Sequence, residues 1–313
     1  MPEQASMREA YGRTLVELGK EYPNIVVLDA DLAASTMTKY FMAEFPGRSF
    51  DIGIAEQNMI CIAAGLAASG KLPIASTFAV FAPGRCFDQI RVSIAQPNLN
   101  VKLVVTHGGL SVGEDGISHQ AIEDLSLICS LPGFTVVVPA DAVETAAALR
   151  AIVTHQGPCY VRLGRPNLPV VLDKDYKFEI GKAFTMRPGN DATIIATGIM
   201  VYHALEAAAM LAEENIDCRV LNMSTIKPID RDAVLRAAVE TGAIVTAEEH
   251  MEHGGLGATV AQILGENRPT PIEFIAVKDT YAQSGKPAEL LARYGLTAED
   301  IAQSVRKTIK RKG

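Results

Sequence analysis

Short apolar runs that end in polar or turn residues recur through the first half of the chain. These runs predict β-strands at residues 24–31, 72–78, 101–107, 135–141 and 159–164. Stretches of helical composition lie between them, at residues 6–22, 57–69, 86–96 and 142–155. Continuous apolar strands that alternate with helices are typical of parallel sheets covered on both faces. We therefore predict a doubly wound α/β domain.

A second alternating series begins at residue 192. Strands are predicted at 192–198, 218–228 and 243–249, and helices at 201–216, 232–242 and 257–266. The stretch between the two series, PNLPVVLDKDYKFEIGKAFTMRPGND, is rich in proline and charge, as linkers are. We predict two doubly wound α/β domains, 1–175 and a smaller 186–313, joined by a linker at 176–185.

Composition narrows the class of protein. The 313 residues are 48% hydrophobic and 21% charged, with a net charge of −7, which argues against nucleic acid or an anionic membrane as the main partner. The start MPEQASMREA lacks a basic-then-apolar signal pattern, and no uncharged stretch reaches about 18 apolar residues. The five cysteines are far apart and form no CxxC, as in reduced proteins. We expect a cytoplasmic protein without a membrane span.

One glutamate opens a segment that otherwise looks built for burial. After Glu56 the chain reads QNMICIAAGLAAS, with no charged side chain before Lys71. Small and aliphatic residues surround the whole helical wheel, so we predict a helix buried on all sides. A carboxylate at the start of such a helix is costly to leave unpaired, and the helix dipole or a bound ligand would offset that cost.

The loop THGGLSVGEDGISHQ, residues 106–120, holds two histidines, His107 and His119, around GEDG. It follows a predicted strand, where open α/β sheets place their ligands, and we expect its four glycines to let a ligand approach the backbone. Its ionisable groups suit a polar, hydroxylated substrate, although either histidine alone is equally well explained as structural. The spacing is not that of HExxH or of paired Cys/His sites, so we predict no metal site in this chain.

Two aromatic residues follow the second predicted strand. Phe78 and Phe81, in TFAVFAPGR, are spaced so that they could stack on a flat heterocycle, although ordinary core packing explains them as well. GGLG at 254–257 lacks the full GxGxxG and indicates tight packing at a helix start.

These pieces together resemble the transketolase family, and most closely the C-terminal subunit of split transketolases. The matching segments are DADLAAS (29–35), FPGRSFDIGIAEQNM (45–59), STFAVFAPGR (76–85), residues 106–141 and RLGRPNLP (162–169). The resemblance implies a domain that binds the pyrimidine of thiamine diphosphate, followed by a transketolase C-terminal domain. It extends through essentially the whole chain.

The resemblance also implies roles for single residues near the cofactor. Glu56 would bond N1′ of the cofactor's aminopyrimidine, and Phe78 and Phe81 would line that ring. Asp31 and Leu32 would lie near the cofactor. Gly84 departs from the family, because full-length transketolases usually carry a tyrosine there. We therefore expect a differently shaped pocket, with Arg85 nearby.

A second implied set binds the substrate. His107, which with Glu56 makes the catalytic pair, would hold sugar hydroxyls together with Asp115. The substrate phosphate would be bound by His119, Arg8, Ser35 and Arg165. Arginine suits this task because its guanidinium fork matches phosphate oxygens.

One part of the family's machinery is missing. The diphosphate and its Mg²⁺ are bound in this family by GDG and a downstream Asn, and no Asn follows Asp115–Gly116 at that distance. The resemblance thus implies half an enzyme. A separate N-terminal subunit would hold the diphosphate with Mg²⁺ (or Ca²⁺), in an α2β2 heterotetramer that also self-associates through both domains of this chain.

The resemblance implies transfer of a two-carbon ketol unit from a ketose phosphate to an aldose phosphate. By family, the default substrates are pentose phosphates, which would place the enzyme in the pentose phosphate pathway. A branched sugar phosphate is the other option. A 2-oxo acid dehydrogenase E1 β subunit has the same two domains, but the GEDGISHQ loop and the candidate phosphate ligands argue against it. A half of a deoxyxylulose-phosphate synthase-like enzyme also carries IAEQ, yet that enzyme is normally one long chain. A non-catalytic partner subunit is the remaining alternative.

Overall fold

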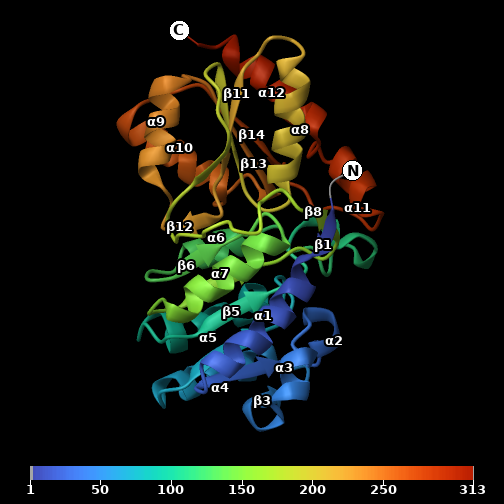
Figure 1. Cartoon of the computed structure of the whole chain (residues 1–313), viewed down its shortest axis with the longest axis vertical. Coiled ribbons are helices and arrows are strands. Elements are labelled where there is room, and N and C mark those ends of the chain that lie inside the picture. The colour runs from blue at the N-terminus through green and yellow to red at the C-terminus, as the bar shows by residue number, and fades with distance from the viewer. Residues whose placement is uncertain (1–2, 313) are drawn as a thin grey trace.

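The computed structural model describes residues 3–312 as two α/β units stacked along the long axis of the molecule (Figure 1). The first unit is built on a seven-stranded sheet, parallel except at one edge. Its strands, in spatial order, are β12 (Thr225–Lys227), β6 (Thr135–Val137), β7 (Cys159–Arg162), β5 (Lys102–Val105), β4 (Leu72–Ser76), β2 (Ile25–Asp29) and β3 (Ser49–Asp51).

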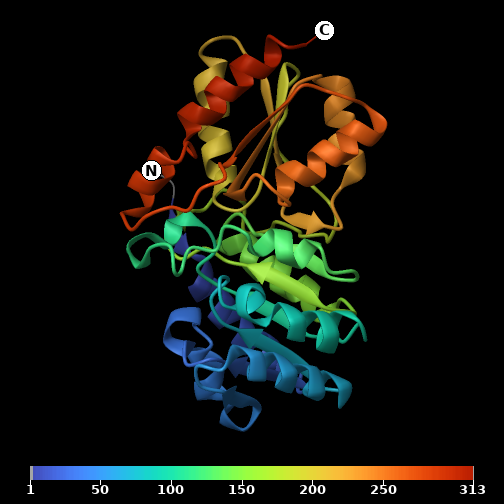
Figure 2. The ribbon, with the colours of Figure 1, turned by 180° about the vertical axis from the view of Figure 1, so that it is seen from behind.

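Helices cover both faces of this sheet. One face packs against α1 (Met7–Glu21), α3 (Lys39–Glu44) and α7 (Ala142–Thr154). The opposite face, which is nearer the viewer in Figure 2, packs against α4 (Glu56–Ala68), α5 (Ala82–Gln89), a π-helical turn (Ile90–Ala95) and α6 (Asp124–Cys129). Local chemistry fixes where some helices begin, because the side chains of Ser6 and Asp141 cap α1 and α7.

The second unit has a five-stranded sheet that is parallel except at β9. Its order is β14 (Ile272–Val277), β13 (Ile244–Met251), β10 (Ala192–Ala196), β11 (Cys218–Asn222) and β9 (Phe184–Arg187). Helices α8 (Met200–Ala212) and α12 (Ala298–Ile309) pack on one face, and α9 (Arg231–Glu240) and α10 (Leu256–Asn267) on the other. The predicted architecture of two mainly parallel, doubly wound sheets is confirmed.

Several strands and a helix connect the two units through contacts that the sequence patterns did not predict. The predicted strand 218–228 is in fact two strands, of which β11 joins the second sheet and β12 pairs antiparallel with β6 of the first. At the junction, β1 (Gln4–Ser6) pairs with β8 (Asn167–Pro169), and α11 (Pro287–Arg293) packs beside the 110–115 turn. Since β12 brings later residues into the first sheet, the limits 1–175 and 186–313 stay a prediction.

Two helix predictions need correction. The helix predicted at 86–96 begins at Ala82, because Pro83 fits the first turn, where its missing N–H costs nothing. The helix predicted to be buried on all sides, α4, is buried on one face only, and Cys61, Gly65 and Ala68 are exposed. The sheet and α5 cover a single side of α4, so its outer side presents a flat surface of small residues. No helix within residues 3–312 has the length and apolar character needed to cross a membrane.

Candidate active site

The predicted site residues gather at one edge of the first sheet. Strands β7, β5, β4 and β2 are parallel neighbours, so their carboxyl ends meet at the same edge. Asp31 follows β2, Phe78 follows β4, His107 follows β5 and Arg165 follows β7. This edge is where open α/β sheets bind ligands.

Four of the predicted site residues form an aromatic cluster, namely Phe78, Phe81, His107 and His119. The rings of Phe78 and Phe81 are stacked with centroids 5.7 Å apart, and His107 stacks on Phe78 at 3.8 Å. His119 meets the edge of Phe81 at 5.4 Å. Phe78 is buried and Phe81 is partly exposed, so the cluster is packed at Phe78 and reaches the surface at Phe81.

Glu56 lies at the border of this cluster and is paired. Its side chain is 5% exposed, and its Oε1 accepts a hydrogen bond from Nη1 of Arg85 at 2.9 Å. The Arg85 guanidinium lies 3.9 Å from the centroid of the Phe81 ring, a cation–π contact. Around Gly84, a Cβ would meet no atom within 4 Å. The space beside Gly84 is therefore open, and Arg85 covers Phe81.

The predicted anion ligands also converge. Nη1 of Arg8 donates to the carbonyl of Ser35, in α2 (Ala33–Thr36), at 2.8 Å, and Nε of Arg8 donates to the carbonyl of Arg165 at 3.2 Å. Burial and the charge of Arg165 lower the pKa of Arg8. Nη1 of Arg165 in turn donates to the carbonyl of Val112 and to Oε2 of Glu114. Two cations held this close favour an anion between them.

The same cations act on His107. Burial, together with the positive charges of Arg8 and Arg165 and the proximity of His119, lowers the pKa of His107 to about 3. Its Nδ1 is 2.8 Å from the hydroxyl of Thr106, and its backbone is left-handed, with φ of 62°. His107 is therefore a neutral imidazole near neutral pH, which can hydrogen-bond hydroxyl groups but carries no charge.

This lowered pKa makes a prediction for stability. The unfolded chain binds a proton at His107 below its ordinary pKa of 6.5, whereas the folded chain does not until about pH 3. The stability that His107 contributes is thus complete above pH 6.5 and is lost as the pH falls towards 3. Replacing His107 with Asn should remove about 2 kcal/mol of the fall in unfolding free energy between pH 6.5 and 5. Urea unfolding across this range measures the effect.

The exposed His253 supplies the control for that experiment. A His253→Asn variant makes the same chemical change at an exposed position outside the aromatic cluster. If His107→Asn and His253→Asn show the same slope as wild type, the buried neutral state of His107 is contradicted.

Three further predicted residues, Asp31, Leu32 and Asp115, lie outside the aromatic cluster. Asp31 has a left-handed backbone, with φ of 60°, and its N–H donates to Oδ1 of Asp51, while the N–H of Leu32 donates to Oδ1 of the buried Asp29. Burial raises the pKa of Asp29. The side chain of Asp115 is exposed and makes no hydrogen bond or ion pair within residues 3–312. Its proposed contact with sugar hydroxyls stays a prediction.

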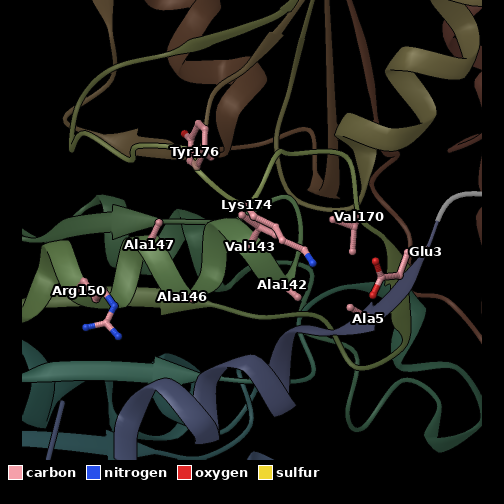
Figure 3. Close-up of a pocket in the computed structure, with 10 residues that line it drawn as sticks. All are labelled: Glu3, Ala5, Ala142, Val143, Ala146, Ala147, Arg150, Val170, Lys174 and Tyr176. Atoms are coloured by element: carbon pink, nitrogen blue, oxygen red, sulfur yellow. The ribbon is translucent and has the colours of Figure 1, made fainter. Parts of the chain in front are cut away.

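Two cavities of the chain lie away from this edge. One, of about 460 Å³, is floored by the alanine-rich side of α7 and bordered by Arg150, Lys174 and Glu3 (Figure 3). Another, of about 650 Å³, lies between β8, α8 and α11. None of the predicted site residues lines either cavity. The candidate site therefore lies outside these two cavities.

Sequence reasoning missed a buried polar group behind the site. Arg162 donates to Oδ2 of Asp124 at 3.0 Å, and the hydroxyl of Tyr160 donates to the same oxygen at 2.7 Å. Arg162 also donates to the backbone carbonyl of Glu249, from the second unit, at 2.9 Å. A charged residue inside the apolar strand CYVRLG, and paired acids in the strand AIVTAEE, were the available signals.

Comparison with known protein families covers both units of the chain. Residues 3–171 match the family model of the transketolase pyrimidine binding domain, and residues 181–301 match that of the transketolase C-terminal domain. The chain belongs to the transketolase family. Membership confirms the resemblance drawn from the sequence and implies dependence on thiamine diphosphate.

Similar transketolase sections have been described as separate chains. A putative transketolase C-terminal section from Methanocaldococcus jannaschii is 44% identical, over 97% of this chain and 96% of that protein. A 6-deoxy-6-sulfo-D-fructose transketolase subunit from a Clostridium species is 43% identical, over 99% and 96%. A solved structure described as a split gene transketolase, inactive beta4 tetramer, superposes with a TM-score of 0.93 at 51% identity, covering 99% of this chain and all of that one.

Proposed function

We propose that this chain is the C-terminal subunit of a two-component, thiamine diphosphate-dependent transketolase. The enzyme would transfer a two-carbon ketol unit from a ketose phosphate to an aldose phosphate. The observation that carries the proposal is the alignment of a buried carboxylate, Glu56, with the stacked rings of Phe78, Phe81 and His107 at one sheet edge.

These residues fit the pyrimidine half of the cofactor. Phe78 and Phe81 offer an aromatic surface for a flat ring, and Glu56 at its border can hold a proton at N1′. Asp31 and Leu32 lie on the adjacent turn after β2. In the chain alone, Arg85 donates to Oε1 of Glu56, while Oε2 accepts no hydrogen bond within residues 3–312 and would be available to the ring. Thiamine diphosphate, when bound, supplies the carbanion chemistry of ketol transfer.

The remaining residues select the substrate. Arg8, Ser35, Arg165 and His119 would bind an anionic group on the sugar, because two guanidinium groups and a histidine meet there. His107, held neutral, would bind sugar hydroxyls together with Asp115. The relative named for 6-deoxy-6-sulfo-D-fructose makes a sulfonated ketose a second candidate for the same anion site.

A partner is required because this chain lacks the diphosphate machinery. The exposed outer face of α4 borders the candidate site and is made of small residues, as a helix that packs against another chain is. We propose that an N-terminal subunit packs at this edge, holds the diphosphate with Mg²⁺ or Ca²⁺, and forms an α2β2 heterotetramer, with contacts between copies of this chain. The inactive beta4 tetramer of the similar split-gene protein supports self-association without a partner.

We further propose domain limits of 1–175 and 186–313, and a cytoplasmic location, since all five cysteines are free thiols. The named relatives are sections and subunits of transketolases, which favours this reaction over that of a 2-oxo acid dehydrogenase.

The test begins with isolation of the tagged chain from its native lysate and mass spectrometry of the proteins that accompany it. We expect a partner that carries GDG and a downstream Asn, ketol transfer by the complex, and none by the chain alone. Ketol transfer by the purified chain alone would refute the two-component proposal. A partnerless homo-oligomer that binds no thiamine diphosphate would instead indicate a non-catalytic subunit.

A further inference from the structure

The four glycines of the loop at residues 106–120 face protein, which corrects the expectation that they admit a ligand. A Cβ on Gly108 would collide with Arg162, and a Cβ on Gly109, where φ is 83°, would collide with the carboxyl group of Glu249. A Cβ on Gly116 would collide with Ser284, and one on Gly113 would lie 3.1 Å from Pro287. Glu249, Ser284 and Pro287 all belong to the second unit, so the loop rests on that unit.

Hydrogen bonds fix this contact near the middle and at the end of the loop. Glu249 is 4% exposed, and its carboxylate accepts hydrogen bonds from the N–H of Ser111 and from the Ser111 hydroxyl, the latter at 3.2 Å. At the far end of the loop, Nε2 of Gln120 donates to the carbonyl of Gln283 at 3.2 Å. A buried carboxylate from one unit thus holds the backbone of the other.

A short chain of hydrogen bonds connects Ser111 to the predicted anion ligands Arg165 and Arg8. The residue after Ser111, Val112, accepts a hydrogen bond from Nη1 of Arg165 through its carbonyl. The carbonyl of Arg165 accepts in turn from Nε of Arg8. The contacts run without a gap from Glu249 to both guanidinium groups that face the candidate anion site.

We propose that Glu249 is a positioning residue for the anionic group of the substrate, and that the C-terminal domain serves the reaction by holding the 108–116 loop in place. The inference rests on the proposed function, which supplies the anion site. It predicts that loss of the contacts between Glu249 and Ser111 impairs recognition of the sugar's anionic group and spares the chemistry at the ketol end.

The charge of Glu249 decides which substitution is conservative. Burial raises its pKa to about 7, while Arg162 and the bonds from Ser111 work in the opposite direction and Asp124 adds to the rise. A protonated carboxyl and a glutamine amide have similar shape, and each offers one acceptor oxygen and a donor. Glutamine can therefore keep both contacts with Ser111, whereas alanine loses both.

The experiment uses the complete enzyme, recovered with its partner through the tagged chain. Steady-state kcat and KM are measured for a ketose phosphate and for the same ketose without phosphate. Glu249→Ala should raise KM for the phosphorylated ketose about tenfold, with kcat within about twofold of wild type and KM for the unphosphorylated ketose unchanged. Glu249→Gln should restore KM to near the wild-type value.

Glu248 supplies the matched control. It is the adjacent buried acid, but it accepts hydrogen bonds from the N–H groups of Leu256 and Gly257 at the start of α10. Within residues 3–312 it makes no hydrogen bond or ion pair with the loop. Glu248→Ala should lower stability and leave the ratio of the two KM values unchanged. An equal rise of KM for both ketoses in Glu249→Ala, or the same selective rise in Glu248→Ala, would overturn the proposal.

A second variant guards against misfolding. If Glu249→Ala cannot be recovered with its partner, Ser111→Ala removes only the hydroxyl contact and should shift KM for the phosphorylated ketose in the same direction by a smaller factor. An unchanged KM for the phosphorylated ketose in Ser111→Ala would then reject the role of Glu249. Failure of the wild-type complex to transfer ketol units would reject the proposed function instead.

Discussion

Replacement of Glu56 by Gln should lower turnover of the assembled enzyme by about 10²–10⁴-fold, the range found when a group that moves a proton is lost. Glutamine has nearly the shape of glutamate, and it can still accept a hydrogen bond from Arg85 through its amide oxygen. It cannot hold a proton at N1′ of the cofactor. Size and packing are preserved, so the loss would report the proton and not the fold.

Initial rates of ketol transfer measure this effect, and gel filtration with the partner measures assembly, which should be unchanged. Asp88→Asn is a suitable control, since it makes the same chemical change at an exposed residue of α5, whose ion pair with Arg91 is also exposed. Wild-type turnover in Glu56→Gln would remove Glu56 from the mechanism. A loss of similar size in Asp88→Asn would show that the assay responds to assembly.

The largest effect on stability should come from Arg162. Its side chain is 5% exposed and donates to Asp124, to the carbonyl of Ala121 and to the carbonyl of Glu249. Arg162→Met fills much of the same space but leaves Asp124 buried without its counter-charge. Breaking one side of a buried pair typically costs 3–5 kcal/mol, so we expect a fall of about 4 kcal/mol in the unfolding free energy.

Urea denaturation followed by circular dichroism tests this value. Arg150→Met should cost less than about 1 kcal/mol, because Arg150 is half exposed and its pairs with Glu17 and Glu21 are at the surface. Combining Arg162→Met with Asp124→Asn should recover part of the loss, since no uncompensated carboxylate at position 124 then remains. Equal costs for Arg162→Met and Arg150→Met would contradict the structural account.

The fold was readable from sequence wherever the signal was local. The cores of β2, β4, β5, β6 and β7 fall inside the five predicted runs because their apolar residues are contiguous. The edge that unites Phe78, His107 and Arg165 was predictable as well, since residues that follow parallel strands share one side of a sheet.

The missed features all depend on distant partners. The run 218–228 gave no sign that its halves join different sheets, because pairing with β6 involves residues about ninety positions earlier in the chain. The pairing of Glu56 with Arg85, and of Gly109 with Glu249, likewise needs tertiary structure. The uniform apolar wheel of α4 gave no sign of which side the sheet and α5 would cover.

The short strand β12 limits where this chain could be divided into two separate polypeptides. By pairing with β6, it closes an otherwise open border of the first sheet with residues that follow the linker. A cut between the domains would uncover the buried strand β6, and an unprotected strand border invites pairing with foreign chains. Division of the chain at residues 176–185 would separate β12 from β6 and open that border, so the two units are expected to stay on one polypeptide.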